Sequence, residues 1–194
     1  MGSIPVAPAK SAYETSNFGS FLVFFNNLCY NIIIMEGKKS QPRAILVFGA
    51  PCSGKTTFSE KLAKRFGLAF FDLGALKSEY NLSRKLVIML VRELAKTGQD
   101  FIIEGCLDTE RDREEIRNIL RAAGYHPSTI WIQTDIATIR SRLKSRYKSI
   151  ASAKHAYDSI IPKLEAPSEI EHPIILSGKH TFETQLKHAL AGLA

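Results

Sequence analysis

Eight consecutive residues, Gly49–Thr56, are of the types that bind the phosphates of a nucleotide. They fit the pattern G-x-x-x-x-G-K-[ST], which defines the P-loop. Gly49 and Gly54 allow backbone conformations that other residues avoid, so successive amides can turn inward onto phosphate oxygens. The ammonium of Lys55 reaches the β- and γ-phosphates, and the Thr56 hydroxyl is suited to ligate Mg²⁺. The run therefore predicts a site for ATP and Mg²⁺.

The residues around this run predict the structural context that the motif requires. The apolar stretch 44–48 directly precedes it and is rich in strand-forming residues. After it, Phe58, Leu62 and Phe66 recur at helical spacing. A strand, a glycine loop and a helix are thus expected in that order. Cys52, inside the loop, is expected to be a small filler, with a redox role as the alternative.

Two carboxylates follow predicted strands, at the edge of the sheet where ligands bind in open α/β folds. Asp72 is the candidate general base or acceptor anchor, because a carboxylate facing the γ-phosphate can orient a hydroxyl and take its proton. The alternative is a helix- or loop-capping aspartate. Glu104 ends a buried strand and is the candidate to hold a Mg²⁺-bound water. The alternative, compatible with the first, is a buried acid bonded to the phosphate-loop backbone.

The segment 140–148 is strongly basic and is predicted to be helical. Arg142 and Arg146 are four residues apart and share one face of this helix. They are the candidates to clamp the oxygens of a transferring phosphoryl group, and a solvated basic face is the alternative. Arg111 and Arg113 follow the third predicted strand. Two alternatives are predicted for them with equal weight: contact with substrate, or an exposed position in solvent.

The chain that positions these residues alternates between strands and helices from Arg43 onward. This pattern predicts a three-layer α/β fold with a parallel sheet and helices on both faces. The strand order 2-3-1-4-5 is implied by the resemblance to a known family that is described below. Strands are expected at 44–48, 69–71, 101–104, 129–133 and 173–176. Helices are expected at 55–66, 82–97, 111–123, 135–148, 152–164 and 181–191, with 73–77 as a loop.

Residues 1–40 differ from the predicted P-loop domain at 41–194. The first 17 residues are small and polar and are expected to be disordered. Residues 18–35 are apolar but are interrupted by asparagines. Because their amide side chains are costly to place in lipid, stable membrane insertion is not expected. These residues are interpreted as an added packing element, a weak membrane or partner segment, or a translation artefact with the true start at Met35, the last being preferred.

Composition limits the classes of function. The chain has 194 residues, a net charge of +7 and three cysteines with no C-x-x-C spacing. The charge suits polyanionic ligands such as nucleotides and permits RNA or DNA as a partner. An odd number of separated cysteines favours the reducing cytoplasm over a disulfide framework. The five histidines show no metal-ligand spacing, which argues against structural zinc.

Taken together, these motifs resemble the small P-loop kinases. The resemblance rests on the Gly49–Thr57 loop, the acid-ended third strand, and the Arg-x-Arg-x-x-x-Arg helix after Trp131-x-x-Thr134-Asp135. The group includes nucleoside monophosphate, shikimate and gluconate kinases and the AAA-type polynucleotide-kinase-like proteins. Glu165-Ala-Pro-Ser-Glu-Ile-Glu171 is most similar to the last of these. The lysine at position 77 differs from the arginine that many polynucleotide kinases carry after the strand-two aspartate.

The resemblance implies an ATP- and Mg²⁺-dependent phosphotransferase that moves the γ-phosphate to a hydroxyl or phosphate of an unidentified acceptor. An RNA- or DNA-end kinase and a non-catalytic NTP-binding module are the alternatives. It implies catalytic roles for Lys55, Asp72, Arg142 and Arg146 and metal contacts from Thr56 and Glu104. It also places His180 and its neighbours beside the adenine. The expected nucleotide-binding residues are Gly49, Ala50, Pro51, Cys52, Ser53, Gly54, Lys55, Thr56, Thr57, Arg142, Gly178 and Lys179.

Overall fold

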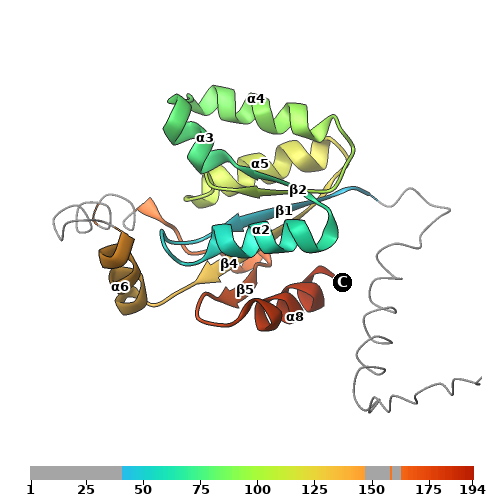
Figure 1. Ribbon diagram of the computed structural model, residues 1–194. Coiled ribbons are helices and arrows are strands. Elements are labelled where there is room, and N and C mark those ends of the chain that lie inside the picture. The colour runs from blue at the N-terminus through green and yellow to red at the C-terminus, as the bar shows by residue number, and fades with distance from the viewer. Residues whose placement is uncertain (1–40, 147–157, 159–162) are drawn as a thin grey trace, which may run out of the picture. The chain divides into compact units, whose positions relative to one another are not determined.

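The computed structural model describes residues 41–146, 158 and 163–194. Within them, five strands form one parallel sheet in the order β2-β3-β1-β4-β5 (Figure 1). This confirms the predicted fold class and strand order. The strands are β1 (Arg43–Phe48), β2 (Ala69–Asp72), β3 (Phe101–Glu104), β4 (His126–Gln133) and β5 (Ile174–Ser177).

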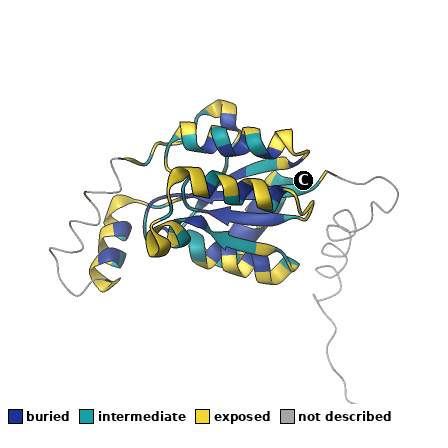
Figure 2. Ribbon diagram, turned by 90° about the horizontal axis from the view of Figure 1, so that it is seen from above, coloured by how far each residue is buried: buried dark blue, intermediate teal, exposed yellow. Residues whose placement is uncertain are grey.

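Helices connect the strands and cover both faces of the sheet (Figures 1 and 2). Apolar residues of α2 and α8 form one core with the sheet, while those of α4 and α5 form another on the opposite face. The central strands β1 and β3 are buried on both faces, which explains the apolar runs Ala44–Phe48 and Phe101–Ile103 within them. The helices are α2 (Lys55–Phe66), α3 (Leu73–Tyr80), α4 (Arg84–Ala95), α5 (Glu110–Ala122), α6 (Ile136–Arg146) and α8 (Phe182–Leu193), with a 3₁₀ turn, η2, at Glu169–Glu171.

One prediction about the backbone near the site is wrong. Residues 73–77 were expected to form a loop, but they belong to α3, which starts at Leu73. The side chain of Asp72 caps this helix by accepting a hydrogen bond of 2.8 Å from the amide of Ala75. Leu73 is buried in the core shared with α4 and α5. Capping and burial together therefore outweigh the low helix propensity of Gly74.

The remaining helix and strand predictions fall within a few residues of the observed elements, except where the structure leaves residues undescribed. The apolar run at 18–35 and nearly all of the helix expected at 152–164 lie outside the described residues. Among the helices that the structure does describe, none is long and apolar enough to span a membrane.

Candidate active site

The phosphate-binding loop connects β1 to α2 and has a backbone that only certain residues permit. Gly54 has a φ of 104°, a left-handed conformation, at the N-cap of α2. A Cβ on Gly49 would lie 2.5 Å from the carbonyl oxygen of Ile132, because the loop passes directly over β4. Cys52 also has a positive φ, of 60°. The two motif glycines are therefore required by the path of the loop.

The N-terminus of α2 is arranged to receive an anion. Gly54 provides no side-chain cap, and the first turn of α2 contains no acidic residue. The first amides of a helix have no partners within the helix and carry a partial positive charge. Lys55 adds a full positive charge at the same end. These features together favour a phosphate group at this position.

Glu104, at the end of β3, faces this helix terminus from the neighbouring strand. Its side chain is 3% exposed, and its Oε1 accepts a hydrogen bond of 2.6 Å from Thr56 Oγ1. The Nζ of Lys55 lies 3.6 Å from the same oxygen. Burial raises the pKa of Glu104, while Lys55 and Thr56 oppose that rise. The alternative prediction for Glu104 was a hydrogen bond to the backbone of the phosphate loop. The two contacts of its Oε1 are instead with the side chains of Thr56 and Lys55.

The second carboxylate oxygen of Glu104 fits the predicted metal role. Oε2 is buried and has no hydrogen-bond partner of regular geometry among the described residues, and the same holds for the hydroxyl of Ser59. The Ser59 hydroxyl interacts weakly with Glu104 and slightly lowers the pKa of that carboxyl. A buried carboxylate oxygen without a regular partner is costly unless a cation or water satisfies it. Thr56 and Glu104 thus form a donor set suited to Mg²⁺ and its water ligands.

Asp72 lies beside Glu104, because the two residues are partners in the parallel register of β2 and β3. The negative charge of Asp72 is one cause of the raised pKa of Glu104. Asp72 Oδ1 caps α3, as the alternative reading of this residue proposed. A Cβ on Gly105 would lie 2.5 Å from the amide nitrogen of Gly74, so the loop after β3 packs tightly against the start of α3. The two carboxylates therefore share one edge of the sheet, next to Lys55.

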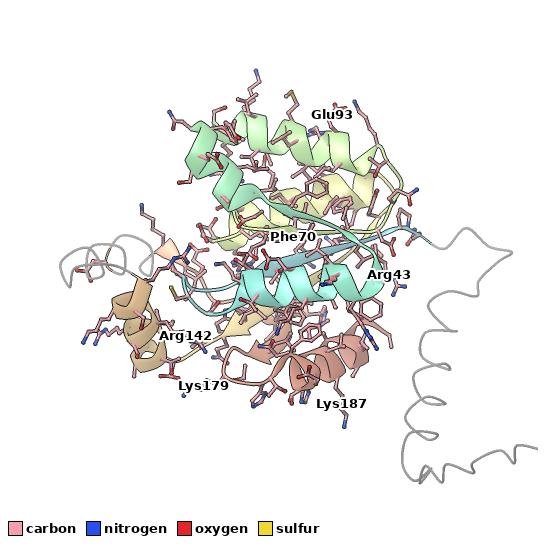
Figure 3. All side chains as sticks on the ribbon, viewed as in Figure 1. Arg43, Phe70, Glu93, Arg142, Lys179 and Lys187 are labelled. Carbon is pink, nitrogen blue, oxygen red and sulfur yellow. The ribbon has the colours of Figure 1, made fainter. Side chains whose placement is uncertain are left out.

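Arg142, on α6, points to the backbone of the phosphate loop (Figure 3). Its Nη1 donates to the carbonyl oxygens of Cys52 and Ser53 at 3.0 and 3.2 Å, and its Nη2 donates to that of Gly178 at 2.9 Å. A single guanidinium thus connects α6, the phosphate loop and the loop after β5. Arg146, one turn further along α6, is exposed. The structure therefore gives the two arginines different surroundings.

The loop after β5 packs against the phosphate loop from the other side. A Cβ on Gly178 would lie 2.1 Å from both Ser53 O and Thr134 Oγ1, and the Thr134 hydroxyl itself donates to Ser53 O at 3.2 Å. Lys179 Nζ lies 2.5 Å from Asp135 Oδ2, and both side chains are about half exposed. This ion pair, together with hydrogen bonds from Thr138, lowers the pKa of Asp135. Sequence reasoning did not identify the contact made by Thr134.

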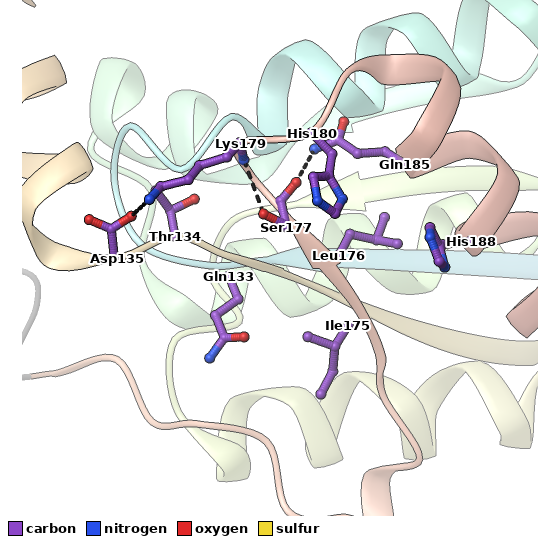
Figure 4. Close-up of a pocket in the computed structure, with 10 residues that line it drawn as sticks. All are labelled: Gln133, Thr134, Asp135, Ile175, Leu176, Ser177, Lys179, His180, Gln185 and His188. Atoms are coloured by element: carbon purple, nitrogen blue, oxygen red, sulfur yellow. Dashed lines mark hydrogen bonds and ion pairs between the residues drawn. The ribbon is translucent and has the colours of Figure 1, made fainter.

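A shallow cavity of about 510 Å³ lies along β5 and the ends of β4 and α8 (Figure 4). The ion pair of Lys179 with Asp135 crosses one end of it, and His180 and His188 line the other (Figure 4). Gly178, which touches the phosphate loop, lies in sequence between Ser177 and Lys179, both of which line this cavity. The predicted adenine-side residues Lys179 and His180 therefore border this cavity, while Gly178 packs against the phosphate loop.

The two arginines near the start of α5 do not behave alike. Arg111 is exposed, in agreement with its solvated reading. Arg113 is fully buried and forms hydrogen bonds with Glu171 at 2.7 and 2.8 Å. Neither reading given to Arg113, substrate contact or solvation, is correct, because its guanidinium is enclosed by protein. The segment that provides Glu171 is the same Glu165–Glu171 stretch noted in the sequence.

A parallel sheet in the order β2-β3-β1-β4-β5, with a glycine loop between β1 and a helix and an acid at the end of β3, defines a P-loop NTPase of kinase-like architecture. The chain belongs to the AAA domain family, which matches residues 45–166. The match includes the phosphate loop, both carboxylates and α6. No curated protein matches the chain in sequence.

Solved structures of small P-loop kinases share this fold. A sugar kinase from Janibacter sp. HTCC2649 is 24% identical with a TM-score of 0.60, and the match covers 78% of this chain and 94% of the kinase. A gluconokinase from Sinorhizobium meliloti 1021 is 16% identical with a TM-score of 0.62, covering 79% and 92%. The APS kinase CysC of Mycobacterium tuberculosis is 15% identical with a TM-score of 0.57, covering 79% and 98%. The likeness to each extends over nearly the whole kinase.

Proposed function

We propose that the protein transfers the γ-phosphate of ATP, with Mg²⁺, to a hydroxyl group of a small molecule. The observation that carries this proposal is the cluster of Lys55, Thr56 and Glu104 at the N-terminus of α2, with Asp72 on the adjacent strand. This cluster combines a phosphate site, a metal donor set and a further carboxylate. The kinase neighbours support the same general chemistry, since each is named for phosphoryl transfer.

Each residue of the cluster has a role that its position supports. Lys55 and the amides at the start of α2 bind the β- and γ-phosphates and stabilise the charge that develops on the transferred group. Thr56 and Glu104 would hold Mg²⁺, which would supply positive charge to the phosphate oxygens. Asp72 accepts the proton of the acceptor hydroxyl through the oxygen that does not cap α3. Arg146, whose side chain is exposed, is available for the phosphate oxygens.

A hydroxyl acceptor fits this site better than a phosphate acceptor. Among the described residues Asp72 forms no ion pair, whereas Glu104 is paired with Lys55, so an acceptor at this edge of the sheet meets the negative charge of Asp72. A phosphate group there would be repelled by like charge, whereas a hydroxyl can donate a hydrogen bond to Asp72. Lys77, at the end of α3, is exposed and can balance an acidic group elsewhere on the acceptor.

A phosphotransfer screen with the full chain tests the proposal. ATP with Mg²⁺ is incubated with D-glucose, D-gluconate, adenosine, AMP or a 5′-hydroxyl oligonucleotide, and phosphorylated product is measured. We expect transfer to a small hydroxyl compound that stops when EDTA is added. Transfer to the oligonucleotide alone would favour the nucleic-acid-end kinase, which the net charge of +7 permits. ATP binding with no transfer to any acceptor would favour the non-catalytic binding module.

A further inference from the structure

Arg113 has an unusual set of contacts for a residue that lies outside the proposed catalytic cluster. Its side chain is fully buried, and Nε and Nη2 donate to both oxygens of Glu171. Nη1 also donates to the carbonyl oxygens of Leu107 and Asp108, at 3.1 and 3.3 Å. These two carbonyls belong to the loop 105–109, which follows β3. One guanidinium therefore fixes two successive peptides of that loop.

The same guanidinium reaches two further parts of the chain. It donates to the carbonyl oxygens of Glu165 and Ala166 at 3.1 and 3.4 Å. Its Cζ also lies 4.3 Å from the centre of the Phe48 ring, and Phe48 directly precedes the phosphate loop. Arg113 thus connects the loop 105–109 both to the segment that leads into β5 and to the end of β1.

The loop that Arg113 holds forms one wall of the proposed acceptor site. Gly105 packs against the backbone of Gly74, and a Cβ on Gly105 would also lie 3.5 Å from Asp72 Oδ1. Cys106 Sγ donates to the carbonyl oxygen of Leu73 at 3.5 Å. A shift of this loop would therefore change the space beside Asp72. Small displacements of positioning groups have large effects on enzymatic rates.

Stability alone does not account for this arrangement. A buried ion pair often contributes no more to stability than apolar residues of the same size, because removing both charges from water is costly. The contacts of Arg113 with the carbonyl oxygens of Leu107 and Asp108 instead specify where the peptides of the loop 105–109 lie. An arginine suits this purpose, because its planar guanidinium presents five donors in a fixed geometry.

We propose that Arg113 and Glu171 are positioning residues that hold the loop 105–109 against Asp72 and so set the shape of the acceptor site. The inference rests on the proposed function, since it takes Asp72 as the residue that binds the acceptor. Arg113 acts through the loop and does not itself touch the acceptor. It should therefore affect the acceptor and leave ATP binding largely unchanged.

Arg113→Lys and Arg117→Lys form a matched pair of variants. Arg117 lies one turn further along α5, and its Nη1 is 3.9 Å from Glu171 Oε2. No hydrogen bond from Arg117 to the loop is found among the described residues, and its Nε has no partner there. Lysine keeps the positive charge beside Glu171 in both variants. Only Arg113→Lys removes the planar set of donors to the loop carbonyls.

Three measurements on the full chain test the proposal. These are hydrogen exchange of the amides at 105–109, the Kd of a fluorescent ATP analogue, and the KM of the best acceptor in the screen described above. We expect Arg113→Lys to raise both loop exchange and acceptor KM about tenfold, with the Kd changed less than about threefold. Arg117→Lys should leave all three close to wild type.

A double variant, Arg113→Met with Glu171→Met, separates positioning from stability. It removes both charges of the pair, so its unfolding midpoint should stay closer to wild type than in Glu171→Met alone, which leaves the buried charges of both Arg113 and Arg117 without Glu171. Loop exchange and acceptor KM should nevertheless remain raised. Wild-type values of both in a folded Arg113 variant would overturn the proposal. If the wild-type protein phosphorylates no acceptor, the proposed function fails, and loop exchange alone still decides whether Arg113 fixes the loop.

Discussion

The hydroxyl of Thr56 donates a hydrogen bond of 2.6 Å to Glu104 Oε1, across 48 positions of sequence. The contact joins the residue after the P-loop lysine to the acid that ends β3. It uses the hydroxyl proton and leaves the oxygen lone pairs of Thr56 available for a cation. The two predicted metal ligands are therefore already adjacent and need no large rearrangement to act together.

Lys55→Ala should reduce phosphotransfer by about 10²-fold or more while the protein stays folded, because the variant lacks the cation at the start of α2. Initial rates at saturating ATP, with circular dichroism as the test of folding, measure this. Lys64→Ala, an exposed change on the same helix, is the control. Unchanged turnover in Lys55→Ala would rule out the phosphate-loop assignment.

Asp72→Asn should lower kcat by about 10²-fold with ATP affinity unchanged, because an amide cannot accept the acceptor proton. Asparagine is as good a helix cap as aspartate, so the stability of α3 should be preserved. Asp72→Ala should lose about 1 kcal/mol in addition, since Ala75 then loses its cap. Rates and urea unfolding of both variants separate the two roles. A normal kcat in Asp72→Asn would assign the proton transfer to another group.

The two arginines of α6 should respond differently to substitution. Arg142→Ala removes the donors to Cys52, Ser53 and Gly178, so it should weaken ATP binding by about tenfold through the shape of the loop. Arg146→Ala should instead lower kcat with a smaller effect on the Kd of ATP. Stopped-flow binding and steady-state kinetics test both. Wild-type kinetics in Arg146→Ala would make that arginine part of a solvated face.

Glu171→Gln should destabilise the protein in a pH-dependent way. Burial alone would raise the pKa of Glu171, but hydrogen bonds from Arg113 and the Ser168 amide, with the charges of Arg113 and Arg117, lower it overall. At pH values between the folded and unfolded pKa, the folded state therefore binds fewer protons than the unfolded state. This carboxylate stabilises the fold fully above its unfolded pKa, and the stabilisation is lost as the pH falls through its folded pKa.

The expected loss for Glu171→Gln at pH 7 is about 2 kcal/mol, since a hydrogen-bonded buried charge is replaced by an amide. The difference from wild type should shrink as the pH falls below the ordinary glutamate value of 4.5. Urea unfolding between pH 3 and pH 8 measures it, with Glu169→Gln, an exposed change in η2, as the control. A difference in unfolding free energy between Glu171→Gln and wild type that does not change with pH would contradict the assignment of Glu171 as a charged carboxylate.

The sheet and the phosphate loop were predictable because each depends on local patterns. Short apolar strands, helical spacing and the glycine motif are all visible within a few residues. The contact of Arg142 with loop carbonyls was not predictable, because it depends on how α6 packs 90 positions away from Cys52. The partner of Arg113 likewise lies 58 positions distant.

One signal for the burial of Arg113 was nevertheless present in the sequence. Arg113, Ile116, Arg117 and Leu120 follow the spacing of one helix face, and all four are buried. Two arginines on an apolar face require acidic or carbonyl partners, because a buried charge without them is costly. The acidic stretch 165–171 contained such partners, but only the tertiary fold brings it to α5.

The open N-terminus of α2 also links the stability of the whole domain to the solution around it. A small oxyanion bound at this terminus would bind the folded chain and not the unfolded one, so by mass action it raises the free energy of unfolding. At a concentration one hundred times its Kd, the gain is about 2.7 kcal/mol. Melting temperatures of variants in this loop are therefore comparable only at fixed phosphate and sulfate concentration. A variant whose melting temperature no longer depends on phosphate or sulfate concentration has lost anion binding at this terminus. This measurement requires no assay of catalysis.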